Sequence, residues 1–486
     1  SRHWTVTSRH QSTTERLGML GRPSVSFTGR RCFSSFPLQP RYKGPTQSVS
    51  LLSSSFRPRF LSSRSSGGDG DDGNEQDDGH VVPMAAKFKN PIVAQLWAWR
   101  EKAKAEVTGM ELPIPDGEPD AKTPSESHIE ISYPFSTDPF IAEAYQNPWQ
   151  DVRMGKIFED LDAFAGNVAF KHVVGNPLIV TAGVDRIRLS HHPHMFGSEP
   201  PKDMKLSGRV TWVGKSSMEI RMQCEQGPKQ EEWLEAYFTF VTLDPKTKRT
   251  IRVPPLRLET DDEREHYERG AVRAQSKKKV RQQKVQVGKP LTEEALNVDR
   301  LAATLLDEAS PLIKLPSVAD PKAILMNQTG LQNALIAQPQ VRNLADRIFG
   351  GYLMRRAFEL AFANAYMFGG SKPMFLEVDD ISFLHPVRVG DLLVFHSRVL
   401  YTRPEGPTLG GIYDSILDHP SQPLIVVEVE VWITEPERAQ ARVSNTFHFT
   451  FALPRWTSCR KVLPSNIEEA RRMAAHMINM EEAASG

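Results

Sequence analysis

The strongest constraint on the fold is an internal repeat that occupies most of the chain after residue 128. In the first copy Asn147 stands eight residues before Gly155, a helix-periodic stretch follows, and then four strand-like runs. In the second copy Asn343 stands eight residues before Gly351, and the same order follows. Both copies end on the tripeptide FTF, at residues 238–240 and 449–451. Repetition on this scale indicates two copies of one structural unit.

The helix of each copy predicts how that unit folds. In the second copy apolar residues cover almost the whole circumference of the helix; they are Leu353, Met354, Ala357, Phe358, Leu360, Ala361, Phe362 and Ala365. A helix that is apolar nearly all round is a buried helix. Because several β-rich runs follow it, we expect an α+β fold of two tandem units, each a curled antiparallel sheet around a central helix.

The amino-terminal part of the chain does not have the composition of a folded unit. Residues 1–68 are rich in Ser and Arg and contain one acid, Glu15, which is typical of an organelle presequence. The stretch RRCFSS at residues 30–35 resembles a mitochondrial processing site, so we favour a mitochondrial address over a plastid one or a disordered tail without address. The acidic, Gly-rich residues 67–79 read as a linker.

These features divide the chain into six segments. They are a presequence with an acidic linker (residues 1–83), a helix and loop (84–128), a first hotdog unit (129–258), a charged linker (259–319), a second hotdog unit (320–454) and a helical tail (455–486). Inside the charged linker the run KKKVRQQK at 277–284 could contact phosphates, but we favour a solvated helix face. Ser465 and Glu468 have the spacing of a capping box before the helix of the tail.

Composition excludes several classes of protein. The net charge of +1 favours neither a nucleic-acid-binding nor a membrane-surface protein. The apolar runs are far shorter than the ~20 residues of a membrane-spanning helix. Three scattered cysteines lack the spacing of a zinc site or a disulfide framework. His191, His192 and His194 are more typical of a polar loop than of a metal site, so we expect no metal.

Several independent motifs carry a family resemblance. They are VRMGKIFEDLDAFAG, LIVTAGVDRI and SGRVTWVGKSSMEIRMQ in the first copy, and RNLADRIFGGYLMRRAFELAFANAYMFGG, VDDISFLHPVRVGDLLVFHSRVLYT and SNTFHFTF in the second. Over roughly residues 129–454 the chain resembles the mitochondrial double-hotdog acyl-CoA thioesterases of the type 9 branch. The resemblance implies acyl-CoA substrates, water as the nucleophile, no metal or organic cofactor, and a mitochondrial address.

The family pattern is an Asn, a short loop, Phe-Gly-Gly, and an acid about two turns into the helix. Asn343 fits the first position, and Phe349, Gly350 and Gly351 fit the substrate-binding turn, where the free N–H groups of a helix terminus would polarise the thioester carbonyl. Asp162 fits the acid position in the first copy. It also falls on an apolar helix face, where a carboxylate is costly unless it is hydrogen-bonded or functional. We therefore expect Asn343 and Asp162 to form a catalytic pair across the two copies.

A possible second site would pair Asn147 with Glu359, and we expect it to be impaired or silent. The acid position of the second copy holds Phe358, and Glu359 is displaced by one residue, which rotates it by about 100° around the helix. Arg355 and Arg356 lie one turn earlier, so an ion pair explains Glu359 more simply. The first copy also has VRMG where the second has IFGG, so it lacks one glycine.

Two other functions remain open at this point. A hydratase or dehydratase of the same fold would carry a GDxNPxH-like motif, which the chain lacks, and a serine esterase would carry GxSxG, which is also absent. A non-catalytic hotdog subunit of a larger assembly is the other alternative. Asp162 and Asn343, both in place, favour an acyl-CoA hydrolase, and hotdog units commonly assemble further, so we expect a homo-oligomer.

Overall fold

The computed structural model describes residues 92–96, 98, 102, 119–175, 177–193, 195–197, 200–227, 229–285, 293–342, 347–404, 417 and 422–485. All of them belong to one compact unit of the chain, which begins at Asp77. The predicted presequence and acidic linker, residues 1–83, lie outside the described residues. Within the segment predicted as a helix and loop (84–128), residues 92–96, 98 and 102 are described and helical.

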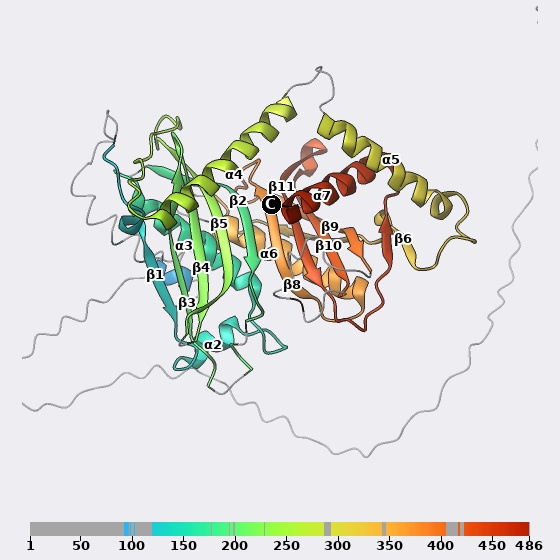
Figure 1. Ribbon diagram of the computed structural model, residues 1–486, viewed down its shortest axis with the longest axis horizontal. Helices are drawn as coiled ribbons and strands as arrows, with labels where there is room; N and C mark the ends of the chain where they lie inside the picture. Colours follow the sequence, from blue (N-terminus) through green and yellow to red (C-terminus); the bar gives the residue numbers. More distant parts are fainter. Residues whose placement is uncertain are drawn as a thin grey trace, which may run out of the picture. The chain divides into compact units, whose positions relative to one another are not determined.

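Ten strands of the described residues form one antiparallel sheet (Figure 1). They are β1 (Ile129–Tyr133), β2 (Leu178–Leu189), β3 (Met204–Val213), β4 (Ser217–Gln226), β5 (Glu231–Leu243), β7 (Leu331–Ile336), β8 (Met374–Ser382), β9 (Leu392–Arg403), β10 (Leu424–Glu435) and β11 (Gln440–Ala452). Their order across the sheet is β1-β3-β4-β5-β2-β8-β11-β10-β9-β7. The second half of this order mirrors the first, because β7 to β11 repeat the roles of β1 to β5. The predicted repeat is therefore confirmed as two five-stranded halves.

The two halves meet where β2 pairs with β8. Val184 is opposite Ile381, and Ile187 is opposite Val378. The dipeptide Val-Asp (VD) recurs in the sequence of both copies, at residues 184–185 and 378–379, so Val184 and Val378 are counterparts. Each pair at this seam is therefore matched by a second pair with the roles of the copies exchanged. The seam therefore has a local twofold symmetry, and it joins the two units into one continuous sheet.

Each half wraps a long central helix, α3 (Met154–His172) in the first and α6 (Gly350–Gly369) in the second. The other helices are α2 (Pro139–Tyr145), α4 (Asp261–Val285), α5 (Glu293–Lys314) and α7 (Ile467–Ser485). Short 3-10 turns occur at η2 (Pro124–Ser127), η3 (Met326–Gln328), η4 (Pro339–Val341) and η6 (Pro436–Arg438), and β6 (Ala323–Leu325) pairs with β12 (Lys461–Leu463) in a separate parallel pair. The central helices inside an antiparallel sheet confirm the predicted hotdog fold.

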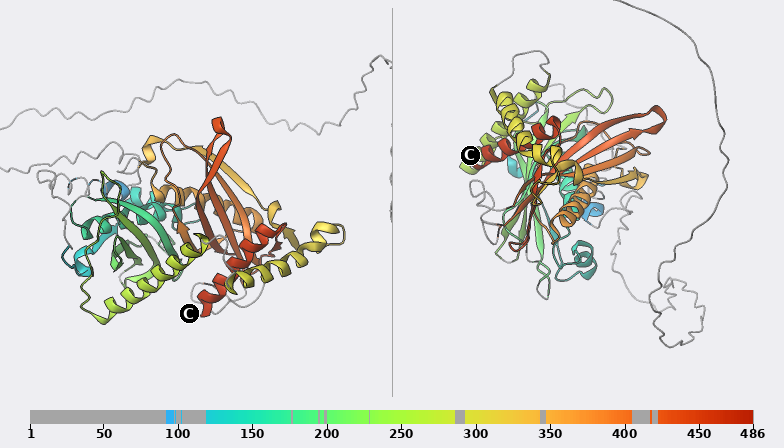
Figure 2. Two further views of the ribbon diagram at one scale, coloured as in Figure 1. Left: turned by 90° about the horizontal axis from the view of Figure 1, so that it is seen from above. Right: turned by 90° about the vertical axis from the view of Figure 1, so that its right-hand side faces the viewer.

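The sheet separates the central helices from the helices outside the repeat. Successive residues of a strand point to opposite faces. On β11 the ring of Phe449 lies 5.7 Å from that of Phe358 on α6, while the ring of its neighbour His448 lies 5.7 Å from that of His476 on α7. Helices α6 and α7 are thus on opposite faces of the second half. In the left-hand view of Figure 2, α4, α5 and α7 lie along the same side of the sheet.

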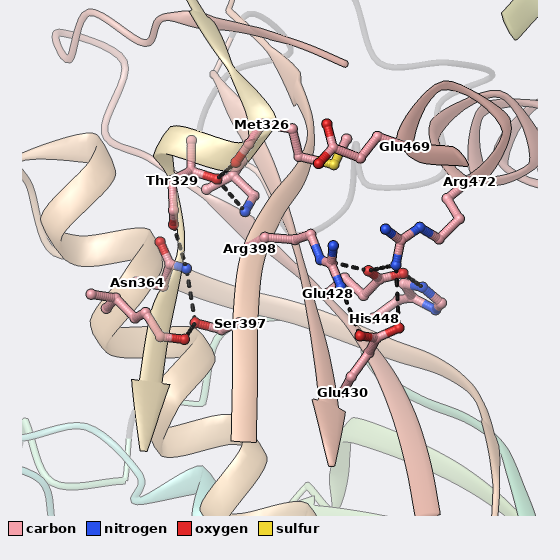
Figure 3. A network of polar contacts seen from close by, with 12 residues as sticks. Met326, Thr329, Asn364, Ser397, Arg398, Glu428, Glu430, His448, Glu469 and Arg472 are labelled. Atoms are coloured by element: carbon pink, nitrogen blue, oxygen red, sulfur yellow. Dashed lines mark hydrogen bonds and ion pairs between the residues drawn. The ribbon is translucent and has the colours of Figure 1, made fainter. Parts of the chain in front are cut away.

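The face of the second half under α7 carries a buried ion cluster (Figure 3). The carboxylate of Glu428 lies 3.0 Å from Nε of Arg398, 3.1 Å from a guanidinium nitrogen of Arg472 and 3.2 Å from Nε2 of His448. Arg472 also contacts Glu430, at 3.2 Å. These pairs attach α7 to β9, β10 and β11. Burial alone would raise the pKa of Glu428, but the hydrogen bond with His448 and the charges of His448, Arg472 and Arg398 together hold that pKa below its usual range.

The structure bears on two predictions, the solvated face of the basic run in the charged linker and the capping box of the helical tail. The start of the basic run lies on α4, where Lys277 forms an ion pair with the buried Asp185 of β2, so its ammonium group packs against the sheet. The predicted capping box of the tail was wrong by one position. Asn466 caps α7 by accepting the N–H of Glu469 at 3.0 Å, and the N–H of Ser465 donates to the Glu469 carboxylate at 2.7 Å.

Candidate active site

Asp162 is the point of closest polar contact between the two central helices. It lies about two turns into α3 and is 4% exposed. Its Oδ2 accepts a hydrogen bond from the backbone N–H of Gly351, the second residue of α6, at 2.7 Å. A carboxylate of the first copy thus contacts the predicted substrate-binding turn of the second.

The start of α6 explains why this carboxylate is stable there. The first N–H groups of a helix have no acceptor within the helix, and its amino terminus carries a partial positive charge. The residue before α6 is Phe349, which is buried and provides no side-chain cap. Asp162 therefore supplies from the other copy the acceptor that a Ser or Asp at the N-cap usually supplies.

Both glycines at the start of α6 are required because α3 and Phe383 approach the α6 backbone too closely to leave space for a Cβ. A Cβ at Gly351 would lie 2.8 Å from Cα of Glu159 and 3.1 Å from Cβ of Asp162. A Cβ at Gly350 would lie 2.9 Å from Oδ2 of Asp162 and 3.2 Å from two ring carbons of Phe383. The space over Gly350 is thus bounded by a carboxylate oxygen on one side and an aromatic ring on the other.

Thr181 on β2 is a site residue that the sequence reasoning missed. Its hydroxyl donates to Oδ1 of Asp162 at 3.0 Å, so each carboxylate oxygen accepts a hydrogen bond from a different element. We call Asp162, Thr181 and the first turn of α6 the first composite site.

Asn343, the predicted partner of Asp162, lies outside the described residues. The residues on either side of it are described: Arg342 and Ile348 pair in an antiparallel bridge directly before α6. In the first copy Gln146 and Val152 form the corresponding bridge directly before α3. The repeat therefore extends to the loops that begin with the two predicted asparagines.

Asn147 and Glu359, the possible second pair, have separate partners. The side-chain oxygen of Asn147 accepts the N–H groups of Trp149 and Asp151, both at 2.9 Å, and so holds its own loop. Glu359 accepts hydrogen bonds from Arg355 at 2.9 Å and Arg356 at 2.7 Å. Among the described residues no contact joins Asn147 to Glu359, and the ion pair expected for Glu359 is present.

The start of α3, where the second pair would act, has a different set of neighbours. A Cβ at Gly155 would lie 3.0 Å from Cγ of Arg355, so the stem of this arginine covers the turn. Arg355 also donates to Glu159 of α3 at 3.2 Å. Burial, followed by the charge of Arg355, lowers the pKa of Lys156 in the same turn. We call the start of α3 and these neighbours the second composite site.

Aligning the two copies residue by residue shows what replaced the acid. With Gly155 and Gly351 as counterparts, Phe358 takes the place of Asp162. On β2, Thr181 is opposite Phe240 next to a bulge. On β8, Phe375 is opposite Phe451 next to the corresponding bulge, so Phe375 takes the place of Thr181. The rings of Phe358 and Phe375 pack edge to face with centroids 5.5 Å apart. The polar pair of the first composite site is therefore an aromatic pair in the second.

Within the described ranges no group of three or more His, Cys, Asp or Glu side chains is placed to hold a metal ion. His192 of the predicted polar loop lies 3.9 Å from Asp151, and His194 falls outside the described residues. No described helix is both long enough and apolar enough to cross a membrane.

Comparison with known proteins gives the family. Residues 344–404 match the model of the Thioesterase superfamily. The mitochondrial acyl-coenzyme A thioesterase 4 of Humulus lupulus is 39% identical over 80% of this chain and 73% of its own length. This chain belongs to the acyl-coenzyme A thioesterase family. It is a thioester hydrolase with the hotdog fold, as the motifs predicted.

Two further relatives place it within the family. Acyl-coenzyme A thioesterase 2 of Humulus lupulus, named chloroplastic, is 38% identical over 80% of this chain and 89% of its own length. Acyl-coenzyme A thioesterase 9 of Mus musculus, named mitochondrial, is 33% identical over 76% of this chain and 82% of its own length. The resemblance to the type 9 branch is confirmed, and the mitochondrial names support the predicted address. The chloroplastic relative corresponds to the plastid alternative.

Proposed function

We propose that this thioesterase hydrolyses acyl-CoA to a free fatty acid and CoA at the first composite site. The observation that carries the proposal is the 2.7 Å hydrogen bond from the Gly351 N–H to the Asp162 carboxylate. It brings an acid, a helix amino terminus and two glycines into one place, and they come from different copies. These are the groups that thioester hydrolysis by water requires.

The proposed chemistry starts with the thioester carbonyl at the start of α6, beside Asp162, where Gly350 and Gly351 have no side chains. The partial positive charge at the start of α6 polarises the carbonyl oxygen. Asp162 accepts a proton from a water molecule as the water oxygen bonds to the carbonyl carbon. The tetrahedral intermediate then breaks its carbon–sulfur bond, and the thiolate of CoA takes the proton back from Asp162.

Thr181 and Asn343 have supporting roles in this proposal. Thr181 fixes the rotamer of Asp162 through its hydrogen bond to Oδ1. Asn343, eight residues before Gly351, supplies an amide that orients the water or the carbonyl oxygen. Phe349, Gly350 and Gly351 form the substrate-binding turn. We further propose that the second composite site is silent, because Phe358 and Phe375 leave no base beside α3, and that the protein works as a homo-oligomer.

The test is release of free thiol from a panel of acyl-CoAs of different chain length by the purified protein. Thiol release that follows enzyme concentration supports the proposal. Addition of water to an enoyl-CoA without thiol release would indicate a hydratase instead. A folded protein that acts on no thioester would indicate a non-catalytic subunit.

A further inference from the structure

The side chain of Arg355 connects the two central helices one turn away from the first composite site. Its guanidinium donates through a terminal nitrogen to Glu159 of α3 at 3.2 Å and through Nε to Glu359 of α6 at 2.9 Å. The side chains of Arg355 and Glu159 are 21% and 11% exposed. One partly buried cation thus bridges carboxylates from both copies.

The position of Glu159 links this bridge to the catalytic acid. Glu159 and Asp162 are three residues apart on α3, and side chains at this spacing share one face of a helix. The start of α6 rests on the same turn, because a Cβ at Gly351 would lie 2.8 Å from Cα of Glu159 and 3.1 Å from Cβ of Asp162. The Arg355–Glu159 pair and the Gly351–Asp162 bond are therefore two neighbouring contacts across one helix crossing.

We propose that Arg355 is a positioning residue for Asp162, so that the second composite site has become a clamp for the first. This inference rests on the proposed function. The arginine occupies the start of α3, and its ion pair with Glu159 sets how closely α6 approaches the turn that carries the base. A displacement of about 1 Å at a reacting group can cost about 100-fold in rate. The planar guanidinium presents its donors in a fixed fork, with Nε toward Glu359 and a terminal nitrogen toward Glu159, whereas a lysine has a single ammonium nitrogen.

The experiment compares kcat, KM and unfolding for Arg355→Met, Arg355→Lys and the matched control Arg356→Met. Arg356 is the next residue on α6 and donates to Glu359. We expect Arg355→Met, which keeps the stem over Gly155, to lower kcat by roughly 10- to 100-fold, with KM changed by less than about threefold. Arg355→Lys should recover part of the loss, and Arg356→Met should stay within about twofold of the wild type.

A second pair of variants separates positioning from simple stabilisation. Arg355→Met leaves the buried Glu159 without this partner, which is destabilising, and adding Glu159→Gln removes that charge. We expect the double variant, Arg355→Met with Glu159→Gln, to be more stable than Arg355→Met alone. Its kcat should stay as low as in Arg355→Met alone and in Glu159→Gln alone. A kcat that recovers together with stability, or a kcat of Arg355→Met close to that of the wild type, would overturn the inference. Loss of activity in Asp162→Asn alone would then leave the proposed function standing, whereas a wild type inactive on every acyl-CoA would remove both.

Discussion

The two composite sites of this protein have the same backbone and different chemistry. At the first, the start of α6 faces Asp162, whose carboxylate accepts hydrogen bonds from the Thr181 hydroxyl and from the Gly351 N–H. At the second, the start of α3 is covered by the stem of Arg355, and the counterparts of Asp162 and Thr181 are two packed phenylalanines. The strand order and the central helix are common to both copies, whereas the buried acid and the hydroxyl of Asp162 and Thr181 occur only at the first composite site.

The difference has an energetic reason. A buried carboxylate is costly unless its oxygens are hydrogen-bonded, so a site that no longer acts gains stability by losing it. Phe358 and Phe375 bury aromatic surface in a cluster that includes Phe158 and Phe449, and each buried side chain of this size contributes about 1.5–3 kcal/mol. The second copy thus has packed aromatic surface where the first copy has a buried, hydrogen-bonded carboxylate.

The largest expected effect on kcat comes from replacing each of the two acids, Asp162 and Glu359, by its amide. Asp162→Asn keeps the size of the side chain and removes the base, so kcat should fall by roughly 1000-fold. Glu359→Gln should retain most of the activity, because this acid serves an ion pair with Arg355 and Arg356. Steady-state thiol release measures both. Equal losses from the two variants would show that the sites are not asymmetric.

The glycines at the two helix starts give the next largest contrast. In Gly351→Ala the new methyl would meet the backbone of α3 at Glu159, which cannot move aside easily, so the helices must separate. We expect a loss of about 100-fold in kcat/KM. In Gly155→Ala the methyl would meet only the flexible stem of Arg355, and we expect a loss below about tenfold. If the two variants lose activity alike, both helix starts bind substrate.

The Thr181 hydroxyl should have a smaller effect. Thr181→Val removes the hydrogen bond to Oδ1 of Asp162 at nearly constant volume. A hydrogen bond to a charged group is worth about 1.5–3 kcal/mol, so we expect kcat to fall by roughly tenfold or somewhat more. The matched change in the second copy, Phe375→Leu, should affect stability and leave kcat within about twofold. The opposite ranking in kcat would place the active site in the second copy.

The smallest expected effect is a loss of native stability at acidic pH, caused by a histidine at the carboxyl end of α3. His172 at the end of α3 is buried with Nε2 2.9 Å from the carbonyl of Pro254, and desolvation lowers its pKa to about 4. The unfolded chain binds this proton near pH 6.5, before the native protein does, so native stability falls as the pH drops from about 6.5 to about 4.

The loss should reach roughly 1 kcal/mol at pH 5.5, and urea unfolding at pH 7.5 and 5.5 measures it. At the corresponding position α6 has Phe368, which cannot titrate. His172→Gln should therefore show a smaller drop in stability between the two pH values than the wild type. An unchanged drop would assign the acid sensitivity to another group.

Much of this architecture could be predicted from the sequence because the repeat marks counterparts directly. The eight-residue spacing, the all-apolar helix and the VD dipeptides located both units, and the shift from Asp162 to Phe358 and Glu359 indicated the asymmetry. Thr181 was missed although a signal existed. Three residues before VD the first copy has a threonine and the second has Phe375, and this polar-for-aromatic exchange repeats the one between Asp162 and Phe358.

The remaining features depend on distances between copies, which no local pattern contains. Arg355 was interpreted as a partner of its neighbour Glu359, and the sequence gives no sign that it also reaches Glu159 on the other helix. That contact arises because pairing of β2 with β8 brings the starts of α3 and α6 together. The prediction of the α7 cap was wrong for a simpler reason, because Ser465 and Asn466 are adjacent and both residue types are good N-caps.

The most direct test of the account is a crystal structure of the Asp162→Asn variant with a non-hydrolysable thioether analogue of acyl-CoA. The account predicts one analogue for each chain, with its thioether sulfur and the adjacent acyl carbon over Gly350 and next to residue 162, and the start of α3 still covered by Arg355. An analogue bound over Gly155, with Arg355 displaced, would contradict it.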